Sequence, residues 1–180
     1  MILTISGLHG TGKSTIGRLV AERLAIRYYS TGQAFRDLAN EMNLTLEEFT
    51  EYVENNPEID KKLDHKIIEI AQKGNIIIDS QLSAYILETI ADFKILLICP
   101  LEIRVKRMAE RDNESYDEKL KETIMREDSE LNRYKKLYNI DLKDEEKIVK
   151  LYNLIIDTGT LTIDDVLEQI LSAVRGQKFS

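Results

Sequence analysis

The chain has 180 residues, 43% of them hydrophobic and 32% charged, which is enough for one domain with a single sizeable core. Its net charge of −7 argues against a nucleic-acid partner, because binding a phosphate backbone requires a concentrated basic face. A single cysteine, Cys99, rules out an internal disulfide and suits the reducing cytoplasm, and no apolar run is long enough to span a membrane.

The first predicted element is a strand over residues 2–6, which runs directly into a glycine-rich loop and then a helical pattern. The loop has the spacing G-x-x-x-x-G-K-S of a phosphate-binding P-loop, in the strand-loop-helix setting that this motif requires. Its glycines let consecutive backbone N–H groups face an anion beside the positive end of the helix. We therefore predict that ATP is bound by Gly7, Leu8, His9, Gly10, Thr11, Gly12, Lys13, Ser14 and Thr15.

Two side chains of this loop have predicted roles. Lys13 can reach the β- and γ-phosphates, and the Ser14 hydroxyl can ligate Mg²⁺. His9 occupies a free position of the motif, and we expect its side chain to be solvated.

Further apolar runs predict four more strands, at about 26–30, 75–79, 94–99 and 153–157. Because these runs are continuous rather than alternating, we expect strands that are buried on both faces. The predicted fold is a three-layer α/β sandwich with a five-stranded parallel sheet and helices on both faces.

Helix ends are marked by capping residues. Capping boxes are predicted at Thr45-x-x-Glu48 and Ser115-x-x-Glu118, and Thr162 can begin a last amphipathic helix. Pro57 and Gly74 bracket another helix, and the tail after Gly176 is expected to fray.

Two segments are too long to be simple crossovers between strands. Residues 31–74 carry three helical patterns, and residues 101–147 carry a helix, a turn at Asp112-Asn113 and a longer helix. We expect the first to be an acceptor-binding flap and the second a lid. Both would belong to a single kinase domain whose core comprises residues 1–30, 75–100 and 148–176.

Arginines in the second segment suggest a site for a transferring phosphoryl group. Arg104, Arg107 and Arg111 recur at i, i+3 and i+7 on one helix, and Arg126 and Arg133 are seven residues apart on the next. Positioned cations are the main requirement of phosphoryl transfer. Ion pairing with nearby acids explains the pattern equally well, the candidates being Glu102, Glu110, Asp128 and Glu130.

Two strand ends carry further candidates. Ser30-Thr31-Gly32-Gln33-Ala34-Phe35-Arg36 begins the first long segment, where Arg36 could hold the phosphate of an acceptor. Asp79 ends an apolar strand as a Walker B acid does, and could hold Mg²⁺ or orient the acceptor. A turn residue at a strand end is the other interpretation of Asp79, and it applies also to Asp157.

The order of these motifs resembles the archaeal type of cytidylate kinase, a nucleoside monophosphate kinase. The resemblance covers nearly the whole chain and is most specific at Arg126-Glu127-Asp128-Ser129-Glu130-Leu131-Asn132-Arg133-Tyr134. It implies phosphorylation of CMP, and of dCMP as a second acceptor, by ATP and Mg²⁺. A monomer acting on small nucleotides is the expectation for this architecture.

The resemblance also implies roles for individual residues. Arg126 and Arg133, with Lys13, would neutralise charge around the transferred group. Glu130 would lie near the acceptor sugar or position these arginines. The acceptor would be bound by Thr31, Arg36, Asp79, Ser80, Gln81 and Glu130.

Gln81 departs from the expected pattern, because relatives should carry an arginine there and an amide does not replace a bidentate guanidinium. Two alternatives therefore stay open: a P-loop kinase for another monophosphate or dephospho-coenzyme A, and a nucleotide-binding switch without transfer activity. A GTPase is disfavoured because no Asn-Lys-x-Asp segment follows the fourth predicted strand.

Overall fold

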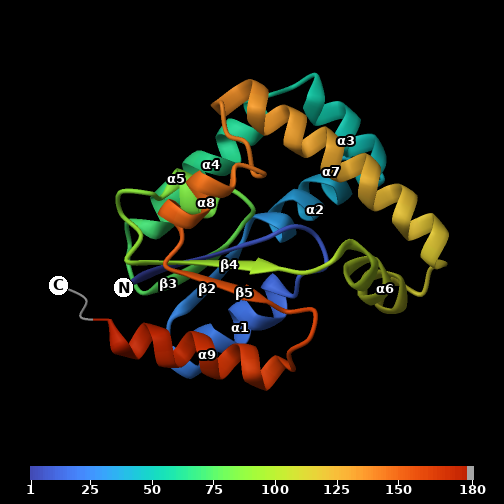
Figure 1. Cartoon of the computed structure of the whole chain (residues 1–180). Helices are drawn as coiled ribbons and strands as arrows, with labels where there is room; N and C mark the ends of the chain where they lie inside the picture. The colour runs from blue at the N-terminus through green and yellow to red at the C-terminus, as the bar shows by residue number, and fades with distance from the viewer. Residues whose placement is uncertain (178–180) are drawn as a thin grey trace.

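The computed structural model describes residues 1–177, and their strands form one parallel sheet in the order β2-β3-β1-β4-β5 (Figure 1). The strands are β1 (Ile2–Ser6), β2 (Arg27–Ser30), β3 (Ile76–Asp79), β4 (Phe93–Ile98) and β5 (Leu154–Asp157). The five predicted strands are confirmed to within one residue at each end. The expected fraying after Gly176 falls mainly on residues outside the described part of the chain.

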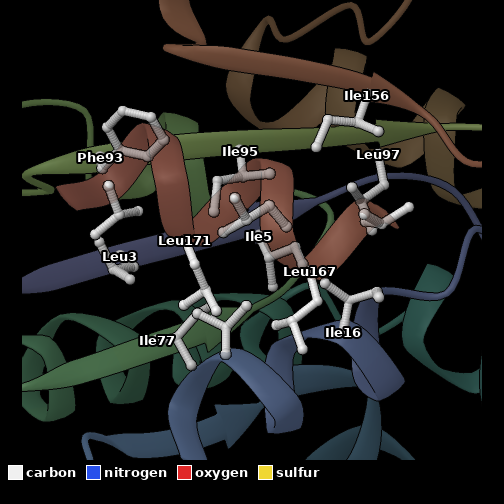
Figure 2. Packing of buried hydrophobic residues seen from close by; sticks show 14 of the residues in the cluster. Leu3, Ile5, Ile16, Ile77, Phe93, Ile95, Leu97, Ile156, Leu167 and Leu171 are labelled. Carbon is white, nitrogen blue, oxygen red and sulfur yellow. The ribbon is translucent and has the colours of Figure 1, made fainter. Parts of the chain in front are cut away.

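Helices cover the sheet on both sides, which confirms the predicted three-layer sandwich (Figure 1). On one side α1 (Lys13–Leu24) and α9 (Ile163–Gly176) pack together, and Figure 2 shows their apolar side chains meeting those of β1 and β4. On the other side α4 (Glu58–Ala71) and the short α5 (Ser83–Ile86) enclose a smaller cluster around Ile76 and Ile78. The two clusters fix the strand ends, which position the site.

Burial on both faces holds only for the centre of the sheet. β3 is wholly buried and β1 nearly so, whereas burial alternates along β4. Ile98 is 44% exposed and Ile155 on the edge strand is 39% exposed. The prediction of two buried faces was wrong for β4 and β5, because α9 covers one face there and no long helix among residues 1–177 covers the other (Figure 1).

The first long segment contains α2 (Thr31–Glu41), α3 (Leu46–Glu54) and α4, as predicted. The second contains α6 (Leu101–Asp112) and α7 (Tyr116–Tyr138), separated by Asn113 with a left-handed φ of 57°. The predicted box at Thr45 is confirmed, whereas Ser115 caps α7 without the reciprocal backbone bond, because Glu118 accepts from the serine hydroxyl.

Two short helices were not predicted from the sequence, α5 and α8 (Glu145–Leu151). Asp144 caps α8 through the backbone N–H of Lys147, and two glutamates follow in its first turn. This acidic start is a recognisable helix signal in retrospect. Within residues 1–177, no helix combines the length and apolar character needed to cross a membrane.

Candidate active site

A cavity of about 1310 Å³ opens over the carboxyl ends of the strands. It is lined by the P-loop after β1, by Ser30 at the end of β2 and by Asp79 and Ser80 at the end of β3. Helices of both long segments complete its walls. Among the predicted residues, those that line it are His9, Gly10, Thr11, Gly12, Lys13, Ser14, Thr15, Thr31, Arg36, Asp79, Ser80, Gln81, Arg126, Glu130 and Arg133.

The P-loop has the backbone geometry that an anion cradle needs. Gly7, Gly10 and Gly12 all have positive φ, and a Cβ added at Gly10 would lie 2.7 Å from the carbonyl oxygen of Arg104. Lys13 folds over the loop, its Nζ donating to the Leu8 carbonyl at 2.9 Å. Gly7 and Leu8 border a smaller cavity of about 140 Å³ behind the loop instead of the main cavity.

Burial lowers the pKa of Lys13, and the carboxylates of Asp79 and Glu130 act in the opposite direction. A desolvated ammonium beside an amide cradle is arranged to interact strongly with a phosphate.

The side chains of Asp79 and Ser14 are hydrogen-bonded to each other, which places two oxygen ligands side by side. The Ser14 hydroxyl donates to Asp79 Oδ2 at 2.7 Å, and the Tyr28 hydroxyl donates to the same atom at 2.6 Å. Burial and the Asp79 charge raise the pKa of Tyr28 to about 12. A hydroxyl and a carboxylate are oxygen ligands of the type Mg²⁺ prefers, so these residues fit the predicted ion. Sequence reasoning missed Tyr28, whose position on β2 carries no recognisable motif.

Three guanidinium groups approach one another in the cavity. Burial lowers the pKa of Arg36, and the positive charges of Arg111 and Arg126 lower it further. Arg36 is held by Gln33 Oε1 at 2.9 Å, and Arg111 forms an ion pair with Asp112 at 2.6 Å. Like charges gathered on a cavity wall stabilise a bound anion.

The arginines of α6 do not share one environment. Arg104 is buried beneath the P-loop, where it donates to the His9 carbonyl at 2.8 Å and forms an ion pair with Glu127 at 2.5 Å. Arg107 lines the main cavity but donates to the carbonyl of Thr158 at 2.7 Å. The idea of a single guanidinium row was therefore wrong for Arg104, because its position on the helix faces the loop and not the cavity.

The His9 side chain is partly buried and hydrogen-bonded, whereas we expected it to be solvated. Its Nε2 lies 2.7 Å from Glu130 Oε2, and Gln81 Nε2 donates to that same carboxylate oxygen at 2.7 Å. Burial would raise the pKa of Glu130, but His9, Arg126 and Gln81 outweigh it and lower the pKa to about 2. The P-loop, the end of β3 and α7 thus meet at one carboxylate, and Gln81 contributes a neutral donor to it.

Two contacts join α7 to α4 across the cavity. Arg133 Nε donates to Asp60 Oδ2 at 2.7 Å in a buried ion pair, and the Tyr138 hydroxyl donates to Asp64 Oδ2. Of the acids named as arginine partners from the sequence, Glu130 lies 3.7 Å from Arg126, whereas Asp60 was not considered. These pairs connect residues more than 70 positions apart, so no local pattern indicates them.

Asp64 should make stability depend on pH. Burial raises its pKa from 3.8 to about 6, so between those values the folded protein binds more protons than the unfolded chain. The folded state should therefore lose stability from this group as the pH rises from about 4 to about 6. Asn does not titrate, so the free energy of unfolding of Asp64→Asn should rise relative to that of the wild type as the pH rises. The difference should reach up to about 3 kcal/mol at pH 7.

Urea unfolding of both proteins at pH 4, 5, 6 and 7 measures this difference. Glu69→Gln, on the exposed side of the same helix, is the matched control and should track the wild type. A gap between Asp64→Asn and wild type that is constant with pH would contradict a raised pKa for Asp64.

Comparison with known proteins agrees with this arrangement. The cytidylate kinase-like family matches residues 2–160. A protein named cytidylate kinase from Methanocaldococcus jannaschii is 40% identical over 99% of both chains, and one from Staphylothermus marinus is 41% identical over 91% of this chain and 90% of its own.

Solved structures show the same fold at low sequence identity. Shikimate kinase from Acinetobacter baumannii in complex with shikimate has a TM-score of 0.62 at 15% identity, covering 99% of this chain and 95% of its own. An uncharacterised protein from Eubacterium ventriosum reaches 0.71 at 14% identity, covering 98% and 99%. With the family match spanning most of its length and close relatives spanning nearly all of it, the chain belongs to the cytidylate kinase-like family.

Proposed function

We propose that the protein transfers the terminal phosphoryl group of ATP to CMP, giving ADP and CDP, and that dCMP is a second acceptor. The observation that carries the proposal is one cavity that contains both the P-loop with Lys13 and the cluster of Arg36, Arg111 and Arg126. Its volume of about 1310 Å³ exceeds the roughly 300–1,000 Å³ usual for a single small ligand, so two nucleotides can lie end to end.

In this mechanism the loop amides and Lys13 hold the donor phosphates, and Arg36 holds the acceptor phosphate. Arg126 approaches from the lid to balance the charge on the transferred group, with Glu130 fixing its position at 3.7 Å. Ser14 and Asp79 are the residues that would hold Mg²⁺, which when bound supplies charge neutralisation at the donor phosphates. The attacking oxygen of CMP is already anionic, with a second pKa of about 6, so no general base is needed.

We also propose that residues 31–74 and 101–147 act as flap and lid over the core. Both segments line the cavity, and their closure would exclude water and so protect ATP from hydrolysis. The protein is proposed to act as a monomer in the cytoplasm, where a single unpaired cysteine stays reduced.

A coupled assay of ADP release tests the function, with CMP, dCMP, UMP, AMP and dephospho-coenzyme A as separate acceptors. The highest kcat/KM is expected with CMP. Absence of turnover with every monophosphate would sink the proposal, and preference for dephospho-coenzyme A would replace it.

An inactive nucleotide-binding switch is the alternative that Gln81 leaves open in the sequence, and relatives named cytidylate kinase do not favour it. Gln81 gives Glu130 a neutral donor where an arginine would give a charge. If the protein is such a switch, calorimetry should show ATP binding with an affinity that added CMP does not change, and no CDP should form.

A further inference from the structure

One wall of the cavity has a chemistry that phosphate binding does not use. It lies where the C-terminal part of α7 meets α4 through the Arg133–Asp60 and Tyr138–Asp64 contacts, whereas the helix that runs alongside α7 in Figure 1 is α3. Beside its charged groups, this wall has Leu63 from α4 and Tyr134 and Tyr138 from α7, and elsewhere the cavity is also lined by Phe35 of α2 and Leu46 of α3. Flat hydrophobic walls of this kind accommodate a heterocyclic base better than they do a phosphate or a sugar.

Two carboxylates one helical turn apart project from α4 into this wall, and they differ in their partners. Asp60 is 8% exposed and is neutralised by Arg133. Asp64 has the neutral hydroxyl of Tyr138 on its Oδ2, and no cation of the described chain forms an ion pair with it. A half-buried carboxylate without a cation is costly to keep, and such groups concentrate at functional sites.

The Oδ1 atom of Asp64 is available to a ligand. Within residues 1–177 it makes no hydrogen bond, and the residue lines the cavity. A carboxylate only accepts hydrogen bonds, so its complement is a ligand N–H group. On pyrimidines this separates the bases, because cytosine carries an exocyclic amino group where uracil carries a carbonyl oxygen.

We propose that Asp64 selects the acceptor base by accepting a hydrogen bond from the exocyclic amino group of CMP, with Tyr138 as the positioning residue that orients the carboxylate. This inference rests on the proposed function, since it assigns the base end of the same acceptor site. UMP would place a carbonyl oxygen against the carboxylate, leaving two acceptors facing each other in a partly buried place.

Comparing CMP with UMP tests this contact, because the two bases differ only in the group at position 4 and in the proton on the adjacent N3. Wild type should prefer CMP by roughly 10- to 100-fold in kcat/KM. In Asp64→Asn the amide can both donate and accept, so the CMP/UMP ratio should fall toward one while the KM for ATP stays within twofold. Tyr138→Phe keeps the carboxylate but removes its partner, and should shift the ratio in the same direction by a smaller factor.

Glu69→Gln removes an equal charge from the exposed side of α4 and should leave the ratio unchanged. A CMP/UMP ratio that survives in Asp64→Asn, or a wild type that does not discriminate, would overturn the assignment. Tyr138→Phe tests the same contact independently of any change at Asp64, and an unchanged ratio there overturns the assignment.

Calorimetric titration with CMP and UMP keeps this test separate from that of the proposed function. If the wild type binds CMP more tightly than UMP but transfers no phosphate, the activity fails and the base assignment stands. Equal binding of both nucleotides would reject Asp64 as the selecting residue whatever the activity.

Discussion

Replacing Lys13 by alanine should lower kcat for phosphoryl transfer by roughly a thousandfold and leave the fold intact. Lys13 is the cation built into the P-loop, desolvated and held over the loop by the Leu8 carbonyl. Its ammonium would meet the β- and γ-phosphates at the moment when negative charge moves between them. Arg104 beneath the loop cannot substitute for it, because that guanidinium is committed to Glu127 and to the loop backbone.

Steady-state kinetics with CMP and ATP measure the loss, and thermal unfolding checks the fold. Lys106→Ala is the matched control, because it removes the same charge from a side chain on α6 that is 73% exposed. Near-normal kcat in Lys13→Ala would refute the phosphate role, whereas a large fall in both variants would point to a general effect of charge.

The second large effect is expected at the buried pair of Arg133 and Asp60. Both side chains are at least 90% buried, and burial raises the pKa of Asp60 despite the nearby guanidinium. Arg133→Ala would leave that carboxylate without a cation, which costs about 3–5 kcal/mol of folding free energy. The same variant should lose activity, whether Arg133 acts on phosphate or only supports the wall.

A double variant separates these two roles. Asp60→Leu with Arg133→Leu replaces the ion pair by apolar groups, so most of the stability should return in urea unfolding. If Arg133 neutralises the transferred group, kcat stays low in the double variant, and if the pair is structural, kcat recovers with stability. A double variant as unstable as Arg133→Ala would contradict the account of an unpaired carboxylate.

The fold was predictable because its signals are local. The runs at 2–6 and 75–79 are largely apolar and continuous, which predicts buried strands. The P-loop glycines stand at the positions where the loop backbone needs a conformation that glycine adopts readily. Asp79 was recognisable from its place after such a run. Its bond to Ser14 follows from the parallel pairing of β1 with β3.

The interior of the site was less predictable because it depends on contacts between distant segments. His9 stands at a position of the motif that admits many residues, and only the approach of α7 explains its contact with Glu130. Arg104 has the same helical spacing as Arg107 and Arg111, yet burial under Gly10 gives it a different role. Asp64 belongs to no sequence motif. The role proposed for it depends on the structure, in which no cation of the described residues forms an ion pair with its carboxylate.

The supports of α7 have a mechanical consequence. The helix is 23 residues long, and its contacts with the P-loop, with Arg104 and with α4 lie between Glu127 and Tyr138. Its first half carries Arg126 and packs against α6, where Lys119 forms an ion pair with Asp112. A tilt of about 10° at Glu130 would move the first turn, roughly 20 Å away at 1.5 Å per residue, through about 4 Å. Because α6 packs against the first half of α7, such a tilt would also displace the end of α6, where Arg111 lies.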